Sequence, residues 1–312
     1  SSPLTGTYST SYSGWVVVKV RNTTNTQAGQ KCWINVTYTA PAVVDTRATT
    51  NAFATRAAIW TGNKGTNNPT DCGNWEEGKM PGVGIDLIIP GYSNPLPQFT
   101  SSLTVKNLTV MSGATLNMSL SEELNITGNI NSVGFINARA VCSGTGLQSI
   151  IGGGTFTGLK IANSNHVQLV NGSILVGNLL DLSSGNLILQ DNNVTINAGS
   201  GTISGGSSVS YIKTANTTSV GGSLIRNVSS TAVSFPVGNT NYTPVTLTNT
   251  GTATNFSVRA FESVLQNGTS GAAMGTTGLL NKTWVITPTT TTGLNVTANF
   301  SWNAIDEGNT FN

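Results

Sequence analysis

The chain has 312 residues, of which only 8% carry a charge, against roughly 25% in an ordinary soluble domain. Its net charge of +2 is small and scattered, which excludes the basic surface of a nucleic-acid-binding protein, and no apolar run reaches the roughly 18 residues of a membrane span. Polar character comes from Thr, Asn, Ser and Gly, which favour strands and turns. We therefore expect an all-β protein, secreted to the extracellular space or the cell surface.

Two strands are predicted near the N-terminus, within a region of N-terminal strands and linker that covers residues 1–58. Residues 14–20 are almost continuously apolar, and residues 32–38 alternate between apolar and polar. Neither strand has a domain of its own, so both are candidates for strand addition to another sheet, within the chain or between neighbouring subunits. The candidate joint residues are Trp15, Val16, Val17, Val18, Val20, Trp33, Ile34, Val36 and Tyr38.

Residues 59–205 are repetitive. Short apolar units recur, for example at residues 108–110, 124–126 and 187–189. Successive units mostly start about five to eight residues apart, which is tight for hairpins. The units pause at a Gly-rich break near residue 152 and then resume. This spacing predicts a parallel β-solenoid, or β-helix, with a cap at its N-terminal end. Apolar residues would face its interior, and Asn, Thr and Gly would occupy its corners.

Residues 206–312 have longer strand patterns separated by turns, which is typical of an antiparallel β-sandwich. The sequence ends soon after Trp302, so we expect this sandwich to be incomplete. The predicted strands are residues 223–228, 233–236, 245–249, 255–261, 283–287 and 294–302.

Several of these segments resemble modules of large secreted proteins of Bacteroidetes. The segments are residues 59–62, 73–81, 86–90, 103–130, 224–228, 235–238, 242–245 and 283–286. The resemblance implies export by a type IX secretion system and a role as an adhesin, a surface layer or a matrix component. The C-terminal sorting domain that is usual in that family has no counterpart in this sequence.

The side chains available for catalysis are few. His166 is the single histidine, and it lies among the repeats. No serine stands in a Gly-x-Ser-x-Gly elbow with triad partners, so we expect that the chain is not an enzyme. The enzyme alternative is a solenoid polysaccharide-cleaving enzyme that uses Asp181 and Asp191 on neighbouring coils.

Three cysteines occur, so at least one is unpaired within the chain. Cys32 and Cys72 are the candidate disulfide, whereas Cys142 is expected to be free and buried. Their wide spacing excludes a zinc site.

Five acidic residues are interpreted as exposed loop or turn residues. These are Asp71, Glu76, Asp86, Asp306 and Glu307. Carboxylates and carbonyls could hold calcium, but no Asp-x-Asp-x-Asp-Gly pattern exists. We therefore expect no cofactor, with calcium as the alternative.

Trp60 and Trp75 bracket a polar loop at the start of the repeats. They could stack on sugars, or they could cap the first coil, whose interior and strand edges are otherwise exposed. Together these patterns predict a structural or adhesive surface protein that self-associates, in a sharper form as a filament joined by strand addition. The alternative is a carbohydrate-binding module that binds surface glycans through Trp60, Trp75 or Trp302.

Overall fold

The computed structural model describes residues 57–91, 95–215, 221–275 and 277–311. The predicted strands at residues 14–20 and 32–38 lie outside these residues, and so does Cys32. Strands make up 47% of the structure and helices only 4%, so the all-β class is confirmed. The helical residues form three short 3₁₀ turns: η1 (Cys72–Asn74), η2 (Glu76–Gly78) and η3 (Ala304–Asp306).

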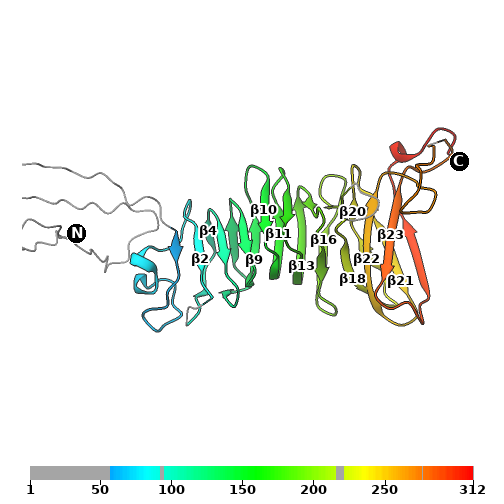
Figure 1. Ribbon diagram of the computed structural model, residues 1–312. Coiled ribbons are helices and arrows are strands. Elements are labelled where there is room, and N and C mark those ends of the chain that lie inside the picture. The colour runs from blue at the N-terminus through cyan, green and yellow to red at the C-terminus, as the bar shows by residue number, and fades with distance from the viewer. Residues whose placement is uncertain (1–56, 92–94, 216–220, 276, 312) are drawn as a thin grey trace, which may run out of the picture.

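One side of the molecule is a first sheet whose nine strands all pair in parallel. Each strand comes from a successive coil, and the coils stack along the long axis of the molecule (Figure 1). The strands are β1 (Ala58–Ile59), β2 (Leu87–Ile89), β5 (Leu108–Val110), β8 (Ile130–Ser132), β10 (Gln148–Ile151), β12 (Val167–Val170), β14 (Leu187–Ile188), β17 (Ile212–Lys213) and β20 (Val237–Gly238). The predicted parallel solenoid is therefore confirmed.

The second sheet covers the remaining sides of the coils. It contains β3 (Gln98–Phe99), β4 (Leu103–Val105), β6 (Thr115–Met118), β7 (Glu123–Ile126), β9 (Phe135–Cys142), β11 (Gly154–Ala162), β13 (Ile174–Ser184), β15 (Val194–Ile196), β16 (Thr202–Gly205), β18 (Leu224–Val228), β22 (Thr254–Phe261) and β23 (Thr283–Pro288). The long strand β9 pairs with both β6 and β7, so this sheet has two wings. A register shift between Phe156 and Gly158 marks the bend between the wings.

Apolar side chains fill the interior in rows, with one residue from each coil. Because side chains alternate along a strand, every second residue points inward. One such row joins register partners that are each at most 1% exposed: Leu87, Leu108, Ile130, Ile150 and Leu169. Burial of one such side chain contributes about 1.5–3 kcal/mol, and the row repeats that contribution in every coil.

Asparagine side chains close the corners between coils. Asn107 donates through Nδ2 to Asp86 Oδ1 at 2.9 Å, and Asn107 Oδ1 accepts from the backbone N–H of Asn129 at 2.7 Å. Asn129 Oδ1 in turn accepts from the backbone N–H of Ser149 at 2.9 Å. Uncharged amides thus satisfy backbone groups that would otherwise lack partners, which explains a corner chemistry rich in Asn.

The Gly-rich break near residue 152 is a corner between β10 and β11, and the solenoid continues through it. Gly152, Gly153 and Gly154 have φ values of +85°, +92° and +98°, which favour glycine. The next coil passes close by, since a Cβ added at Gly172 would lie 2.3 Å from the carbonyl carbon of Gly152. Glycine is therefore required on both coils at this contact.

Parallel strand pairing continues beyond residue 205, where the change from short units to longer strand patterns predicts the boundary between solenoid and sandwich. Strands β17, β18 and β20 still pair in parallel with the coils before them, and pairing becomes antiparallel where β18 meets β22. The last coils contain longer connections than the earlier ones, which is why their spacing resembles that of a sandwich.

The C-terminal end is a two-layer antiparallel unit. One layer continues the second sheet through β18, β22 and β23, and the other is a third sheet of β19 (Val233–Phe235), β21 (Val245–Asn249) and β24 (Val296–Phe300). Side chains of both layers belong to one apolar core, which joins the solenoid interior. In the described residues no helix is long and apolar enough to cross a membrane.

Candidate functional site

Trp60 and Trp75 close the N-terminal end of the apolar core. Their rings meet edge to face with centroids 4.9 Å apart, and the residues are 0% and 3% exposed. Each indole N–H donates to a proline carbonyl at 2.8 Å, Trp60 to Pro95 and Trp75 to Pro69. This burial fits the cap interpretation, and it leaves neither ring with an open face on which a sugar could stack.

The cysteines occupy unlike positions. Cys72 begins η1 and is half-buried, while Cys32 lies outside the described residues, so their disulfide stays a prediction. Cys142 is buried in β9, and burial raises the pKa of its thiol to about 12. A thiol with that pKa stays protonated and unreactive near neutral pH.

His166 stands at a coil corner. Its φ is 73°, and its Nδ1 accepts a hydrogen bond from the backbone N–H of Asn186 at 3.0 Å. Asn186 makes the same kind of contact with the following coil, since its Oδ1 accepts a hydrogen bond from the backbone N–H of Tyr211 at 3.0 Å. His166 thus acts in the same way as the corner asparagines.

Four charged side chains gather on the outer face of the second sheet, and we call them the charged quartet: Glu123, Arg139, Lys160 and Asp181. Arg139 bridges Glu123 at 3.4 Å and Asp181 at 3.5 Å, and Lys160 lies 3.7 Å from Glu123. Gly158 lies on β11, between the strands that carry Arg139 and Asp181, and it is the register partner of Arg139. The quartet is a balanced set of two acids and two bases.

Local sequence patterns do not predict this quartet. The predicted partner of Asp181 was Asp191, but Asp181 lies on β13 in the second sheet, whereas Asp191 follows β14 in the first. Lys160 and Asp181 are register partners on successive coils. Charges repeated at one coil length were the signal that could have revealed the cluster.

The antiparallel end has an open side. Among the described strands, β23 pairs only with β22, and β24 pairs only with β21, so each has a free edge. Trp284 of β23 and Phe300 of β24 lie with ring centroids 4.9 Å apart, which places both edges on the same side. Val296 and Phe300 of β24 are 39% and 41% exposed there.

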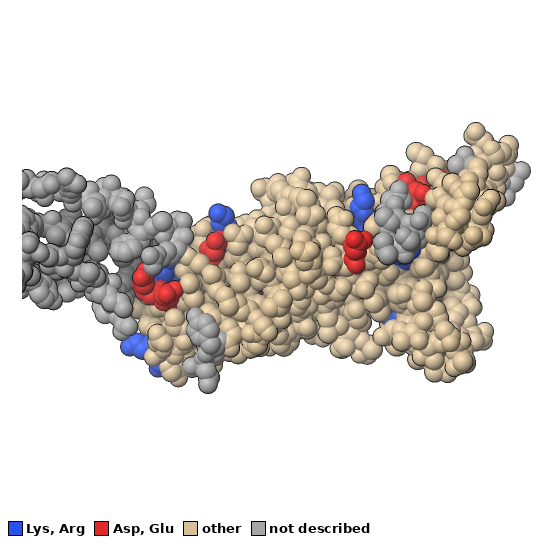
Figure 2. All heavy atoms as spheres, in the orientation of Figure 1, with Lys and Arg blue, Asp and Glu red and all other residues tan. Residues whose placement is uncertain are grey.

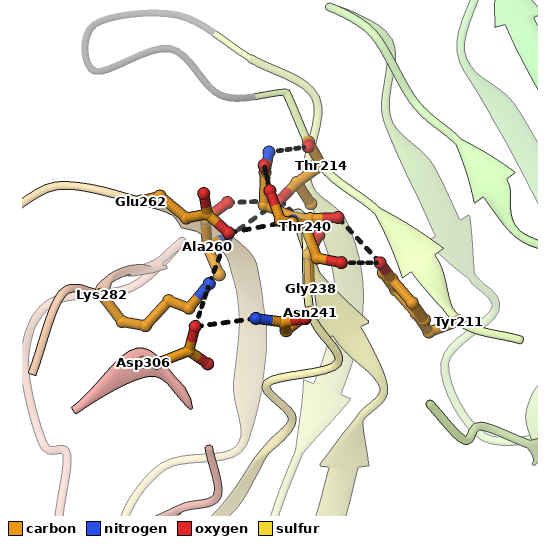
Figure 3. Close-up of polar contacts among 10 residues, drawn as sticks. Tyr211, Thr214, Gly238, Thr240, Asn241, Ala260, Glu262, Lys282 and Asp306 are labelled. Carbon is orange, nitrogen blue, oxygen red and sulfur yellow. Dashed lines mark hydrogen bonds and ion pairs between the residues drawn. The ribbon is translucent and has the colours of Figure 1, made fainter. Parts of the chain in front are cut away.

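A buried polar network lies at the same end, on the loops beside β22 and β23 (Figure 3). Lys282 Nζ contacts Glu262 Oε1 at 2.8 Å and Asp306 Oδ1 at 3.3 Å, and its side chain is 0% exposed. Asn241 Nδ2 donates to the same Asp306 oxygen at 2.8 Å, while Asp306 Oδ2 is buried without a hydrogen-bond partner. Asp306 is therefore not the exposed turn residue that the sequence suggests, because η3 folds its side chain inward.

The pKa of Glu262 reflects two opposing influences. Burial raises it, but hydrogen bonds from Lys282 and from Thr240, together with the charge of Lys282, lower it more, so the pKa lies below its ordinary value. Glu262 is therefore ionised at neutral pH and able to accept a proton or a hydrogen bond.

Trp302 lies at the surface of the antiparallel end. Trp302 is 41% exposed, donates to Glu307 Oε1 at 2.9 Å, and meets Phe311 edge to face. Across the described ranges, no three His, Cys, Asp or Glu side chains are grouped so that they could hold a metal ion. Figure 2 shows the visible face largely free of charged side chains, with the few Lys, Arg, Asp and Glu in small separate groups.

Comparison of the chain with models of protein families, with curated proteins and with solved structures found no match in any of the three.

Proposed function

We propose that this chain is a secreted structural or adhesive surface protein, not an enzyme, and that it assembles end to end into filaments. The shape supports this proposal, since parallel pairing is continuous from β1 to β20 along one axis (Figure 1). At a strand spacing of about 4.8 Å, the nine strands of the first sheet span about 40 Å. Continuous pairing of this kind makes a stiff spacer.

The observation that carries the proposal is the open side between β23 and β24. Two free strand edges and a half-exposed apolar surface at Phe300 are features that proteins normally cover. An added strand would pair with either edge and bury this surface. We assign that role to residues 14–20 of a neighbouring copy, whose apolar side chains suit the inside of a sandwich.

The joint would connect opposite ends of the rod. Residues 14–20 precede β1, which begins the solenoid, whereas β23 and β24 lie at its far end (Figure 1). A contact of this kind is heterologous, so it propagates into a filament unless its rotation closes a ring.

Electron microscopy tests the assembly. We expect filaments from the full chain and single short rods from a variant that lacks residues 1–40. Identical assembly of the two proteins would contradict the joint. Phe300→Asp should weaken assembly, whereas Val209→Asp, at a solenoid residue that is 75% exposed, should leave it unchanged.

A second candidate function is favoured by the charged quartet. Carboxylates and basic groups on the open face of a parallel sheet could bind or cleave an acidic polysaccharide. We would incubate the protein and its Asp181→Asn variant with uronic and neutral polysaccharides and measure release of reducing ends and binding on a glycan array. Activity lost with Asp181→Asn supports this candidate, and an absence of both cleavage and binding ends it.

A further inference from the structure

The buried network at the antiparallel end contains an amine held against a carboxyl group. Lys282 Nζ lies 3.3 Å from Asp306 Oδ1, at a side chain that is 0% exposed, and Asp306 is 7% exposed. Groups that the fold holds side by side in this way no longer depend on a chance encounter to react. A lysine attacks a carboxyl carbon only after it gives up a proton, so a neighbouring group that accepts one is also needed.

The backbone fixes both reactants. Lys282 directly precedes β23, and the N–H of Asn281 donates to the carbonyl of Asp306 at 2.9 Å. Asp306 sits in η3, where its own N–H donates to the carbonyl of Asn303 at 2.8 Å. The two side chains therefore approach from segments that hydrogen bonds already join.

The hydrogen bonds divide the two carboxyl oxygens of Asp306 into different roles. Oδ1 accepts from Asn241, which would stabilise negative charge on that oxygen during attack on the carboxyl carbon. Oδ2 is buried without a partner, a costly state for a carboxylate oxygen. Glu262 stands on the other side of Lys282 at 2.8 Å, where it can accept a proton.

From this geometry we propose that Lys282 and Asp306 condense into an amide bond in the folded chain, with Glu262 as the proton relay. The bond forms between Nζ and the carboxyl carbon of Asp306, and the bond from that carbon to Oδ2 breaks. Two of the three ammonium protons pass through Glu262 to Oδ2, which leaves as water, and the third stays on the amide nitrogen. No atom changes oxidation state, so no oxidant or co-reactant is needed.

In the product, the amide N–H and the amide oxygen both have hydrogen-bond partners. The amide N–H donates to Glu262, and the amide oxygen, formerly Oδ1, keeps its hydrogen bond from Asn241. The net charge of the site is unchanged, because one ammonium and one carboxylate disappear together. The oxygen without a partner is the one that is lost, and the segment containing β23 and β24 becomes a closed loop.

Intact-mass spectrometry of the denatured full chain tests the bond. We expect a mass lower than the sequence mass by one water molecule, and a tryptic digest that contains one branched peptide joining Lys282 to Asp306. Separate, unmodified Lys282 and Asp306 peptides from the folded protein would overturn the proposal. Loss of ammonia with a branch at Asn241 would overturn Asp306 as the acceptor.

Two variants assign the roles. Lys282→Arg keeps the charge but cannot form the amide, and Glu262→Gln keeps both reactants but removes the relay. Both should show the full sequence mass, with circular dichroism as the check that each has folded. A branched peptide at wild-type yield in folded Glu262→Gln would remove Glu262 from the mechanism. The readout is a mass, so it is independent of filament assembly.

Discussion

The solenoid and the antiparallel end of this molecule bury different kinds of side chain. The solenoid buries apolar rows and neutral amides, and its charged quartet stays at the surface, with Arg139 38% exposed at the side chain. Among the described residues, the buried charged residues Arg259, Lys282 and Asp306 all lie at the antiparallel end, which also exposes apolar edge residues.

This difference shows how the two parts are specified. Each coil is stabilised by the coils on either side of it, so the same simple pattern works in every repeat. The end has no next coil to cover it, and it relies on particular polar contacts and on an edge that a partner can cover. The contacts of buried charged side chains are therefore concentrated at the antiparallel end.

The largest loss of stability is expected when the contact between coils is disturbed. Gly172→Ala should cost more than about 4 kcal/mol of unfolding free energy, since the new Cβ would lie 2.3 Å from the backbone of Gly152. Gly146→Ala is the matched control, because its Cβ would meet nothing within 4 Å. Urea unfolding measures both, and similar stabilities would show that the coils can separate at low cost.

The two kinds of ion pair give the next largest contrast. Lys282→Met should cost about 3–5 kcal/mol, because it removes the buried partner of Asp306 and leaves that carboxylate uncompensated. Arg139→Met should cost less than about 1 kcal/mol, because its pairs are partly exposed. Denaturant unfolding of the two variants measures the difference, and equal costs would contradict the distinction between the two regions.

Matched valines compare the packing of the two regions. Val110→Ala in the solenoid, where the residue is 1% exposed, should cost about 2 kcal/mol. Val296→Ala on β24, at 39% exposure, should cost less than about 1 kcal/mol in the unassembled protein. A larger cost at Val296, measured by thermal unfolding at low protein concentration, would mean that β24 is covered in the single chain.

The smallest effect concerns a thiol and needs no substitution. Burial raises the pKa of Cys142 to about 12, so the thiol is protonated at about pH 8 and should resist alkylation in the native protein. The same residue should be labelled rapidly in denaturant, as peptide mass spectrometry would measure. Because the folded pKa exceeds the ordinary value, ionisation above about pH 9 favours the unfolded chain. Rapid labelling of the native protein would show that the strands around Cys142 separate transiently and expose the thiol.

Local patterns were enough to predict most of the strands. Alternation over a few residues predicts β5, β6 and β7, and the longer alternating runs predict β21 and β22, because each strand needs only its own inward and outward faces. The point where parallel pairing ends was not visible locally, since β17 and β20 are short and are recognised only by their partners.

The sequence by itself thus determined an all-β chain with coils at regular spacing, because strand periodicity is written into neighbouring residues. Tertiary structure alone decided which side chains meet. Asn241 and Asp306 are 65 residues apart and join only because sheet pairing folds η3 back on the end of the solenoid. Arg139 and Asp181 lie two coils apart and meet only because the strands that carry them stack in register with β11. Such contacts depend on three-dimensional register, which no local pattern records.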